Sequence, residues 1–386
     1  MADTQLAPRG TATATGPSRL TSVDGVRGAA IFMVVVGHLI GFPGLLTTSS
    51  VYATLFGAPA HVLWDETAAV QIFFVLSGFV LQLGQRQHVS SAAAYRFLIA
   101  RFFRLYPLYG VALLFAFGCR RLWAGHDHLI AFNPELAIFW NQAVGWSELL
   151  NHLVPLFPTA TGSNLNPVLW SIFVEFKFSL MFPLIAVCVA YTEKRTVPFW
   201  LMLAGSLVYS ATSPSGSTGR FLFHFVLGAA LANTAPIWTA ARRTPWNLMG
   251  AAFAVWLLEL RYAPYAPHLD QTHYDLLCAI GGGILLCCVV RSPALDRIFS
   301  APIMVWLGRR TYGIYLFHFP ILLVAITWAM RWFPSNRLAA WTITTIATIP
   351  LACTLGALGY RWIELPGNAF GKSLAAAIAP LRHDRH

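Results

Sequence analysis

The feature of this sequence that most constrains its fold is a succession of apolar runs, several of them close to 20 residues long. A helix of about 20 apolar residues is what crosses the hydrocarbon core of a bilayer. Ten segments of this kind occur near residues 26–46, 66–83, 105–122, 168–191, 197–212, 219–235, 246–261, 273–290, 309–329 and 338–363. Only 11% of the residues are charged, against about 25% in a soluble domain. The sequence therefore predicts an all-α polytopic membrane protein with about ten transmembrane helices.

The distribution of basic residues predicts the orientation of these helices. Cytoplasmic loops of membrane proteins carry an excess of Lys and Arg. With a cytoplasmic N-terminus, 19 of the 26 Lys and Arg residues lie on the cytoplasmic side, six lie on the other side, and Lys177 lies within a span. We therefore expect both termini in the cytoplasm, and the net charge of +11 gives no reason to expect a nucleic-acid partner.

The chain is expected to form one domain. Residues 1–22, rich in Ala, Thr, Gly and Pro, are expected to be a flexible cytoplasmic tail without the pattern of a cleaved signal peptide. Residues 23–366 hold the apolar segments, and residues 367–386 are expected to be a short cytoplasmic tail with no second domain. The longest polar connection, about residues 123–167, is aromatic-rich and is expected to lie at the membrane interface or to dip back into the protein.

The cysteines give no sign of a metal site or a disulfide framework. Nearly all six lie within apolar runs, and none belongs to a CxxC pair or to a Cys/His spacing that would bind zinc. We expect them to pack as small apolar residues, and we expect no metal.

The first apolar segment contains the stretch VDGVRGAAIFMVVVGH, which joins an arginine to a histidine. The eleven helical steps from Arg27 to His38 make three turns and about 20°, so the two side chains share a face about 16 Å apart. An ionisable group in a membrane costs a few kcal/mol and is a functional candidate. His38 is either a general base or a packing histidine bonded to a carbonyl. Asp24 can pair with Arg27 on the same face.

A second polar group lies within the stretch LWSIFVEFKF. Glu175 follows Ser171 by one helical turn, and Trp170 precedes that serine. A carboxylate at this depth needs a partner, and the pair is either structural or functional. The candidate partners are Arg27, His38 and Lys177.

Two further clusters have both a structural and a functional interpretation. Arg101 and Arg104, at the expected cytoplasmic edge of a span, are either a positive-inside anchor or a clamp for phosphate groups, whose oxygens match the forked donors of arginine. Ser77, in FFVLSGF, suits close helix packing. Tyr315 and His318 continue a polar-aromatic stripe that is either a packing surface or a pocket wall.

Taken in order, these stretches resemble the membrane acyltransferase family 3, the integral-membrane O-acyltransferases of bacterial surface saccharides and some secondary metabolites. The resemblance covers about residues 20 to 366. It is carried by SVDGVRGAAIFMVVVGH, FFVLSGF, RFFRLYP, LWSIFVEFKFSLMFP, LGRRTYGIYLFHFPIL and IELP.

The resemblance implies roles for individual residues. Arg27 and His38 look like the family's Arg-x10-His signature, whose histidine is regarded as catalytic. Arg101 and Arg104 look like its Arg-x-x-Arg motif, which is associated with the acyl donor. Asp24, Ser77 and His318 match positions typical of the family.

One motif departs from the family pattern. Glu175 matches the first glutamate of SVEEQFYL, but Phe176 stands in place of the second glutamate and Lys177 in place of the glutamine. The departure argues against a role shared between two carboxylates and bears on the choice of acceptor.

The resemblance therefore implies an acyl-CoA-dependent O-acyltransferase in a bacterial plasma membrane. An acetyl or other short acyl group would pass from acetyl-CoA or another acyl-CoA to a hydroxyl of a surface polysaccharide, lipopolysaccharide or lipid-linked saccharide. The alternatives are acylation of a small secreted metabolite such as a macrolide, and a proton-coupled transporter or flippase. The expected catalytic residues are His38, Glu175, Arg27 and Asp24, the donor-binding residues are Arg101, Arg104 and Arg27, and the substrate-binding residues are Ser77, Trp170, Ser171, Tyr315 and His318.

Overall fold

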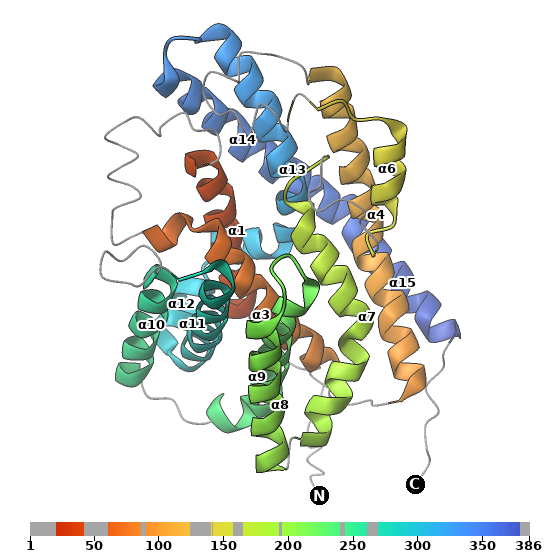
Figure 1. Cartoon of the computed structure of the whole chain (residues 1–386), viewed down its shortest axis with the longest axis vertical. Coiled ribbons are helices and arrows are strands. Elements are labelled where there is room, and N and C mark those ends of the chain that lie inside the picture. Colours follow the sequence, from red (N-terminus) through yellow and green to blue (C-terminus); the bar gives the residue numbers. More distant parts are fainter. Residues whose placement is uncertain are drawn as a thin grey trace, which may run out of the picture.

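The computed structural model describes residues 21–41, 61–85, 90–123, 140, 142–156, 165–192, 195–239, 244–260 and 269–378. Over these residues the regular secondary structure is helical, as the apolar runs predicted, and no strand occurs (Figure 1). The α-helices are α1 (Thr21–Gly41), α3 (Glu66–Gln85), α4 (Ser91–Trp123), α6 (Trp146–Leu153), α7 (Leu169–Thr192), α8 (Thr196–Thr212), α9 (Leu222–Thr239), α10 (Thr244–Glu259), α11 (Gln271–Arg291), α12 (Pro293–Phe299), α13 (Pro302–Trp332), α14 (Arg337–Gly359) and α15 (Leu365–Ile378).

Over the described residues, each of the ten predicted apolar segments overlaps an α-helix, with ends that differ from those predicted. Seven of the described helices are long and apolar enough to cross a membrane: α1, α3, α4, α7, α11, α13 and the continuous helix from Arg337 to Ile378. The helices α8, α9 and α10 have 17, 18 and 16 residues. The polytopic membrane class is thus confirmed, whereas the number of ten spans and the side of the termini stay predictions.

The helices α1 and α13 cross with their backbones in contact near the middle of the molecule. A Cβ atom added at Gly28 would collide with the carbonyl of Met304, and one added at Gly308 would collide with the carbonyl of Asp24. Small residues permit this close approach in membrane proteins. The contact places Arg27 beside α13, which is the most buried of the candidate spans.

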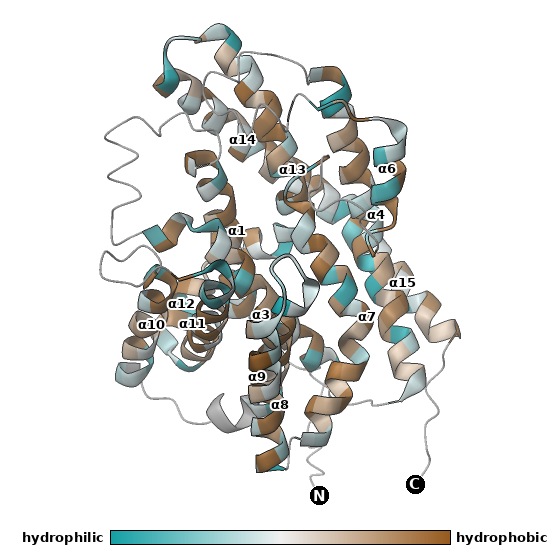
Figure 2. Cartoon of the chain, in the orientation of Figure 1, coloured by the Kyte–Doolittle hydropathy of each residue, from teal (hydrophilic) through white to brown (hydrophobic). Residues whose placement is uncertain are grey.

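Polar residues interrupt helices that are otherwise apolar. Figure 2 shows brown, apolar turns along most of the chain and teal turns part of the way along α4 and α7. Polar side chains within apolar helices are costly in a membrane unless they contact one another or line a cavity. Arg101 of α4 and Glu175 of α7 are two such polar residues, and they meet in the site described below.

The connection expected near residues 123–167 folds back onto the helices where it is described. Trp140 is fully buried. The hydroxyl of Tyr106 donates a hydrogen bond to the carbonyl of Leu153 (2.9 Å), and Asn166 donates to the carbonyl of Leu316 in α13 (3.1 Å). This part of the connection therefore dips into the protein, which is one of the two predicted arrangements.

The C-terminal helix α15 lies along α4, in the region where a short tail was expected to begin. The rings of Phe103 and Phe370 pack edge to face at 4.9 Å. A π-helical turn (Tyr360–Glu364) joins α14 to α15 and places the buried Glu364 next to α4. The motif IELP therefore contributes a carboxylate to the centre of the molecule.

Candidate functional site

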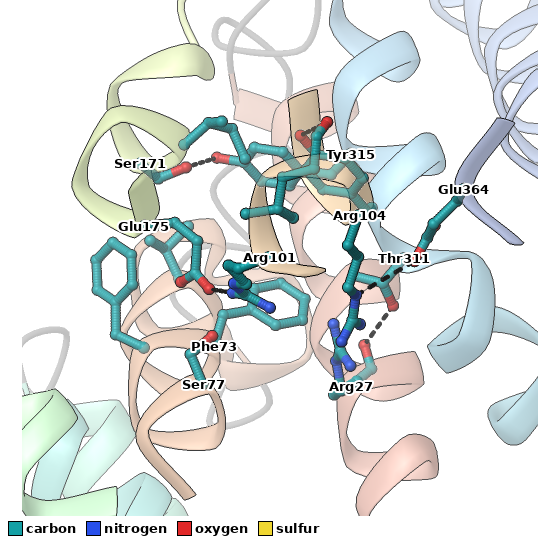
Figure 3. Close-up of a pocket in the computed structure, with 15 residues that line it drawn as sticks. Arg27, Phe73, Ser77, Arg101, Arg104, Ser171, Glu175, Thr311, Tyr315 and Glu364 are labelled. Carbon is teal, nitrogen blue, oxygen red and sulfur yellow. Dashed lines mark hydrogen bonds and ion pairs between the residues drawn. The ribbon is translucent and has the colours of Figure 1, made fainter. Parts of the chain in front are cut away.

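A pocket with about 620 Å³ of empty volume opens between α1, α3, α4, α7, α13 and the π-helical turn (Figure 3). We call it the arginine pocket. It gathers seven of the residues predicted for the site from five different helices, and three of the seven are arginines. The polar lining residues are Arg27, Ser77, Arg101, Arg104, Ser171, Glu175, Thr311, Tyr312, Tyr315 and Glu364.

Glu175 forms an ion pair with Arg101, and none of its three candidate partners is the one observed. Both side chains are nearly buried, with 10% of Arg101 and 13% of Glu175 exposed. Arg101 also donates from Nε to the hydroxyl of Ser179 at 3.0 Å. The expectation was wrong because periodicity along α7 identifies the face of Glu175 but not the helix packed against it.

Arg101 lies within α4 and not at its end. The helix begins at Ser91, so about three turns precede Arg101. Arg104 lies one turn further along, and its Nε is 3.8 Å from Oε1 of Glu364. At 29% exposure, Arg104 is the more accessible of the two guanidinium groups.

The arginine pocket carries a net positive charge. Three arginines and two glutamates line it, and its remaining lining residues are neutral. The backbone carbonyl of Arg27 accepts a hydrogen bond from Thr311 at 3.4 Å, which ties this part of α1 to α13. An excess of guanidinium groups in a partly enclosed pocket favours an anionic ligand, and phosphate oxygens suit their forked geometry.

Asp24 does not line the arginine pocket, although it was expected among the catalytic residues. Its Oδ2 lies 3.5 Å from Nε of Arg309 on α13. It is 6% exposed, and its carbonyl is the group that meets Gly308. Asp24 therefore holds the crossing of α1 and α13, from which Arg27 enters the pocket.

His38 and His318 form a pair in the interior. Nδ1 of His38 lies 3.1 Å from Nε2 of His318, and the ring centroids are 5.1 Å apart. Nδ1 of His318 lies 2.7 Å from the carbonyl of Tyr315. His318 is fully buried and His38 is half-buried. The sequence singled out both histidines but could not pair them, because 280 positions separate them.

The hydrogen bonds of this pair determine the tautomers of two neutral rings. A carbonyl oxygen only accepts, so Nδ1 of His318 carries the hydrogen. Its Nε2 then accepts from Nδ1–H of His38, and Nε2 of His38 bears the lone pair. This places the basic nitrogen of the pair on His38.

Tyr315 connects the histidine pair to the arginine pocket. Its ring lies 5.7 Å from that of His318, and its hydroxyl lies 2.7 Å from the hydroxyl of Ser171. Tyr315 and Ser171 both line the pocket (Figure 3), whereas neither histidine is among its lining residues. Nine of the predicted site residues thus form two groups, the seven that line the arginine pocket and the pair of His38 and His318, and Tyr315 of the first group contacts His318 of the second.

Trp170 lies apart from the arginine pocket. It lines a second pocket, together with Lys177 and residues of α3 and α11. Lys177 points away from Glu175, and its Nζ is 3.3 Å from the hydroxyl of Thr218.

Sequence reasoning missed Glu364 as a site residue. The motif IELP signalled that the segment matters, but only packing against α4 brings its carboxylate to Arg104. Over the part of the chain that the structure describes, no group of three or more His, Cys, Asp or Glu side chains could hold a metal ion.

Comparisons with known proteins bear on this arrangement. A family model described as an acyltransferase domain matches residues 20–357. The chain is 24% identical to the peptidoglycan O-acetyltransferase OatA of Listeria monocytogenes, over 89% of this chain and 55% of that protein. It is 24% identical to a putative O-acetyltransferase of Staphylococcus aureus, over 90% of this chain and 57% of that protein.

A shorter similarity joins the chain to the putative peptidoglycan O-acetyltransferase YrhL of Bacillus subtilis, with 27% identity over 51% of this chain and 34% of that protein. The chain spans little more than half the length of the Listeria and Staphylococcus proteins. No solved structure matches it.

Proposed function

The chain belongs to the acyltransferase 3 family of integral membrane proteins, and from this premise we propose that it transfers an acyl group to a hydroxyl of a saccharide-containing acceptor. The family and the integral membrane location were both expected from the sequence and are confirmed. The relatives named above are bacterial, which agrees with a bacterial plasma membrane. Peptidoglycan is the acceptor in the name of the Listeria protein, and it supports a saccharide acceptor here.

The observation that carries the proposal is the hydrogen-bonded pair of His38 and His318, whose His318 ring lies 5.7 Å from Tyr315, a lining residue of a pocket with an excess of arginine. Acyl transfer to a hydroxyl needs a group that takes the hydroxyl proton and a site that holds the acyl donor. His38 supplies the first, and Arg27, Arg101 and Arg104 supply the second. Tyr315 links the two, since it lines the arginine pocket and its ring lies 5.7 Å from that of His318.

The acyl donor is proposed to be an acyl-CoA or another phosphate-bearing acyl carrier. The net positive charge of the arginine pocket supports a phosphorylated donor, and Arg104, at 29% exposure, is accessible to it.

In the proposed mechanism His38 acts as a general base through Nε2. The acceptor oxygen forms a bond to the acyl carbonyl carbon as His38 takes its proton. The bond to the carrier breaks, and His38 returns the proton to the leaving group. General base catalysis contributes about 10²–10⁴ in rate.

His318 is proposed as a positioning residue. Its Nδ1–H is fixed by the carbonyl of Tyr315, so its Nε2 holds Nδ1–H of His38 and keeps the lone pair on Nε2 of His38. The same hydrogen bond stabilises the imidazolium that forms when His38 takes a proton, as an orienting acceptor does in a catalytic triad.

Two other functions remain as alternatives with defined tests. A small secreted metabolite is an alternative acceptor, and mass spectrometry of envelope glycans and of secreted metabolites, with and without the gene, distinguishes it from a saccharide. A proton-coupled transporter would use the histidine pair as a relay without chemistry.

The test of the proposed function is transfer of a labelled acetyl group from acetyl-CoA by the protein reconstituted in nanodiscs, with peptidoglycan fragments as acceptor. We expect ester-linked label on the acceptor that mild base releases. Absence of label from every saccharide offered, together with proton-coupled uptake in liposomes, would favour the transporter.

A further inference from the structure

A second pocket lies between α3, α7, α11 and the 3-10 turn before α9 (Thr218–Phe221). It has about 1240 Å³ of empty volume, twice that of the arginine pocket. We call it the Lys177 pocket. In Figure 1 the turn between α8 and α9 lies near the centre of the view, well below the turn that joins α13 to α14.

The floor of the Lys177 pocket is a fixed polar network around Asp275. Its Oδ1 accepts hydrogen bonds from Gln71 (2.9 Å) and Gln271 (2.8 Å), and its Oδ2 forms an ion pair with Arg220. Asp275 is 2% exposed and Gln71 is 1% exposed. These groups hold each other in place, so the floor is built before any ligand binds.

Within the described part of the chain, three polar atoms in the lining residues of the pocket are left without a hydrogen-bond partner. The amide nitrogen of Gln71 is committed to a carboxylate, so its Oε1 is an acceptor. Among the described residues, Oε1 of Gln71, Nε of Arg220 and the hydroxyl of Ser217 are buried without a hydrogen-bond partner. All three residues line the pocket. Buried polar atoms are normally satisfied, and a polyhydroxylated ligand offers both donors and acceptors.

An aromatic wall faces the polar floor. Trp170 lines the pocket with 40% of its surface exposed, and its ring lies 5.7 Å from that of Phe221. A flat aromatic surface beside fixed polar groups matches the two sides of a sugar, which presents C–H groups on a face and hydroxyls at its edge.

The cation of Lys177 adds charge selectivity. Its Nζ contacts the hydroxyl of Thr218, and no carboxylate of the described residues lies within 4.0 Å of it. Arg220 is balanced by Asp275, so Lys177 leaves the pocket with one net positive charge. This residue stands where the family pattern has a glutamine, so the charge is a property of this chain.

The Lys177 pocket adjoins the arginine pocket, the proposed donor site. Phe74 lines the arginine pocket, and its ring lies 6.2 Å from Trp170 and 5.0 Å from Phe221, so one aromatic layer separates the two pockets. Trp170 also precedes Ser171, the hydrogen-bond partner of Tyr315.

We propose that the Lys177 pocket is the acceptor site and that it takes a saccharide bearing an anionic group, with the anion on Lys177. The inference rests on the proposed function, since it names the class of the acceptor. The anion is a carboxylate of the sugar or a phosphate attached to it, and the two sources share the chemistry that Lys177 recognises.

The test compares glucose, glucuronic acid and glucose 1-phosphate, which share a sugar ring and differ in the anionic group. Their dissociation constants are measured by ligand-observed NMR on the full chain in nanodiscs, without an acyl donor. We expect at least one anionic sugar to bind about tenfold or more tighter than glucose. The anionic sugar with the lower dissociation constant shows whether the anionic group of the acceptor is a carboxylate or a phosphate.

The variant Lys177→Gln should abolish the preference for an anionic sugar over glucose, and Lys177→Arg should retain most of it. Lys372→Gln removes one charge from an exposed position of α15 and is the matched control, which should behave as wild type. Melting temperatures establish that each variant is folded. Equal affinities for the three sugars in the wild type, or an unchanged preference in Lys177→Gln, would overturn the proposal.

This outcome is separable from that of the proposed function. A preference that depends on Lys177, together with a wild type that transfers no acyl group, would support the pocket and contradict the enzyme. Acyl transfer by the wild type, without any preference for an anionic sugar that depends on Lys177, would support the enzyme and contradict the proposed role of the pocket.

Discussion

Replacing Glu175 by Gln should lower stability and at the same time strengthen binding of a phosphorylated donor. The amide keeps the shape of the side chain and still accepts a hydrogen bond from Arg101, but it removes the charge opposite a guanidinium that is 10% exposed. A hydrogen bond between charged groups contributes about 1.5–3 kcal/mol, against about 1 kcal/mol for a neutral one. We therefore expect unfolding to become easier by about 1–2 kcal/mol.

The same substitution raises the net charge of the arginine pocket from one positive to two, because Glu364 becomes its only carboxylate. Affinity for coenzyme A should increase, whereas Arg101→Ala should lower both affinity and stability. Leu180→Ala, at an exposed apolar position of the same helix, is the matched control.

Stability is measured by equilibrium denaturant titration in mixed micelles, and affinity by equilibrium dialysis with labelled coenzyme A. Opposite signs for stability and affinity in Glu175→Gln support the arginine pocket as the donor site. Weaker binding of coenzyme A in Glu175→Gln would refute that reasoning, because it would mean that the carboxylate itself contacts the donor.

Two further predictions concern Arg104 and His61. Arg104→Ala should weaken coenzyme A binding about tenfold or more, and Arg104→Lys should restore only part of the affinity. The loss of stability should be small, because the ion pair of Arg104 with Glu364 is long (3.8 Å) and partly exposed. An unchanged coenzyme A affinity in equilibrium dialysis would mean that Arg104 is only a positive-inside anchor. Burial lowers the pKa of His61, which lies in the 3-10 turn before α3, so its contribution to folding stability should be complete above about pH 6.5 and decline as the pH falls below that value. The melting temperature of His61→Gln should depend less on pH, and identical pH dependence of the melting temperature in wild type and His61→Gln from pH 5 to 8 would contradict this.

The sequence predicted the elements of this molecule better than their contacts. Runs of apolar residues located the seven candidate spans of the described residues, and the helical period predicted that Arg27 and His38 share one face of α1. Contacts between helices depend on how each helix is rotated against its neighbours, and periodicity within one helix carries no such information. The partner of Glu175 was therefore missed, and His318 was identified without its hydrogen bond to His38.

The Lys177 pocket is a second case in which contacts between helices could not be predicted from the sequence. The departure of Lys177 from the family pattern was visible in the sequence, but its meaning depends on Gln71, Arg220 and Asp275, which lie on three other elements. None of the three belongs to a recognised motif. Only folding brings their polar atoms to one cavity.

The central claim is that His38 is the general base and that His318 orients it. The most direct measurement is acetyl transfer per folded molecule by wild type, His38→Gln and His318→Gln, with folded protein quantified by its size-exclusion profile. His38→Gln keeps hydrogen-bonding groups but has no base near neutral pH, so turnover should fall about 10²–10⁴-fold while coenzyme A binding is unchanged. His318→Gln should retain measurable activity with an altered pH profile. Near wild-type turnover in His38→Gln would contradict the account and make His38 a packing residue.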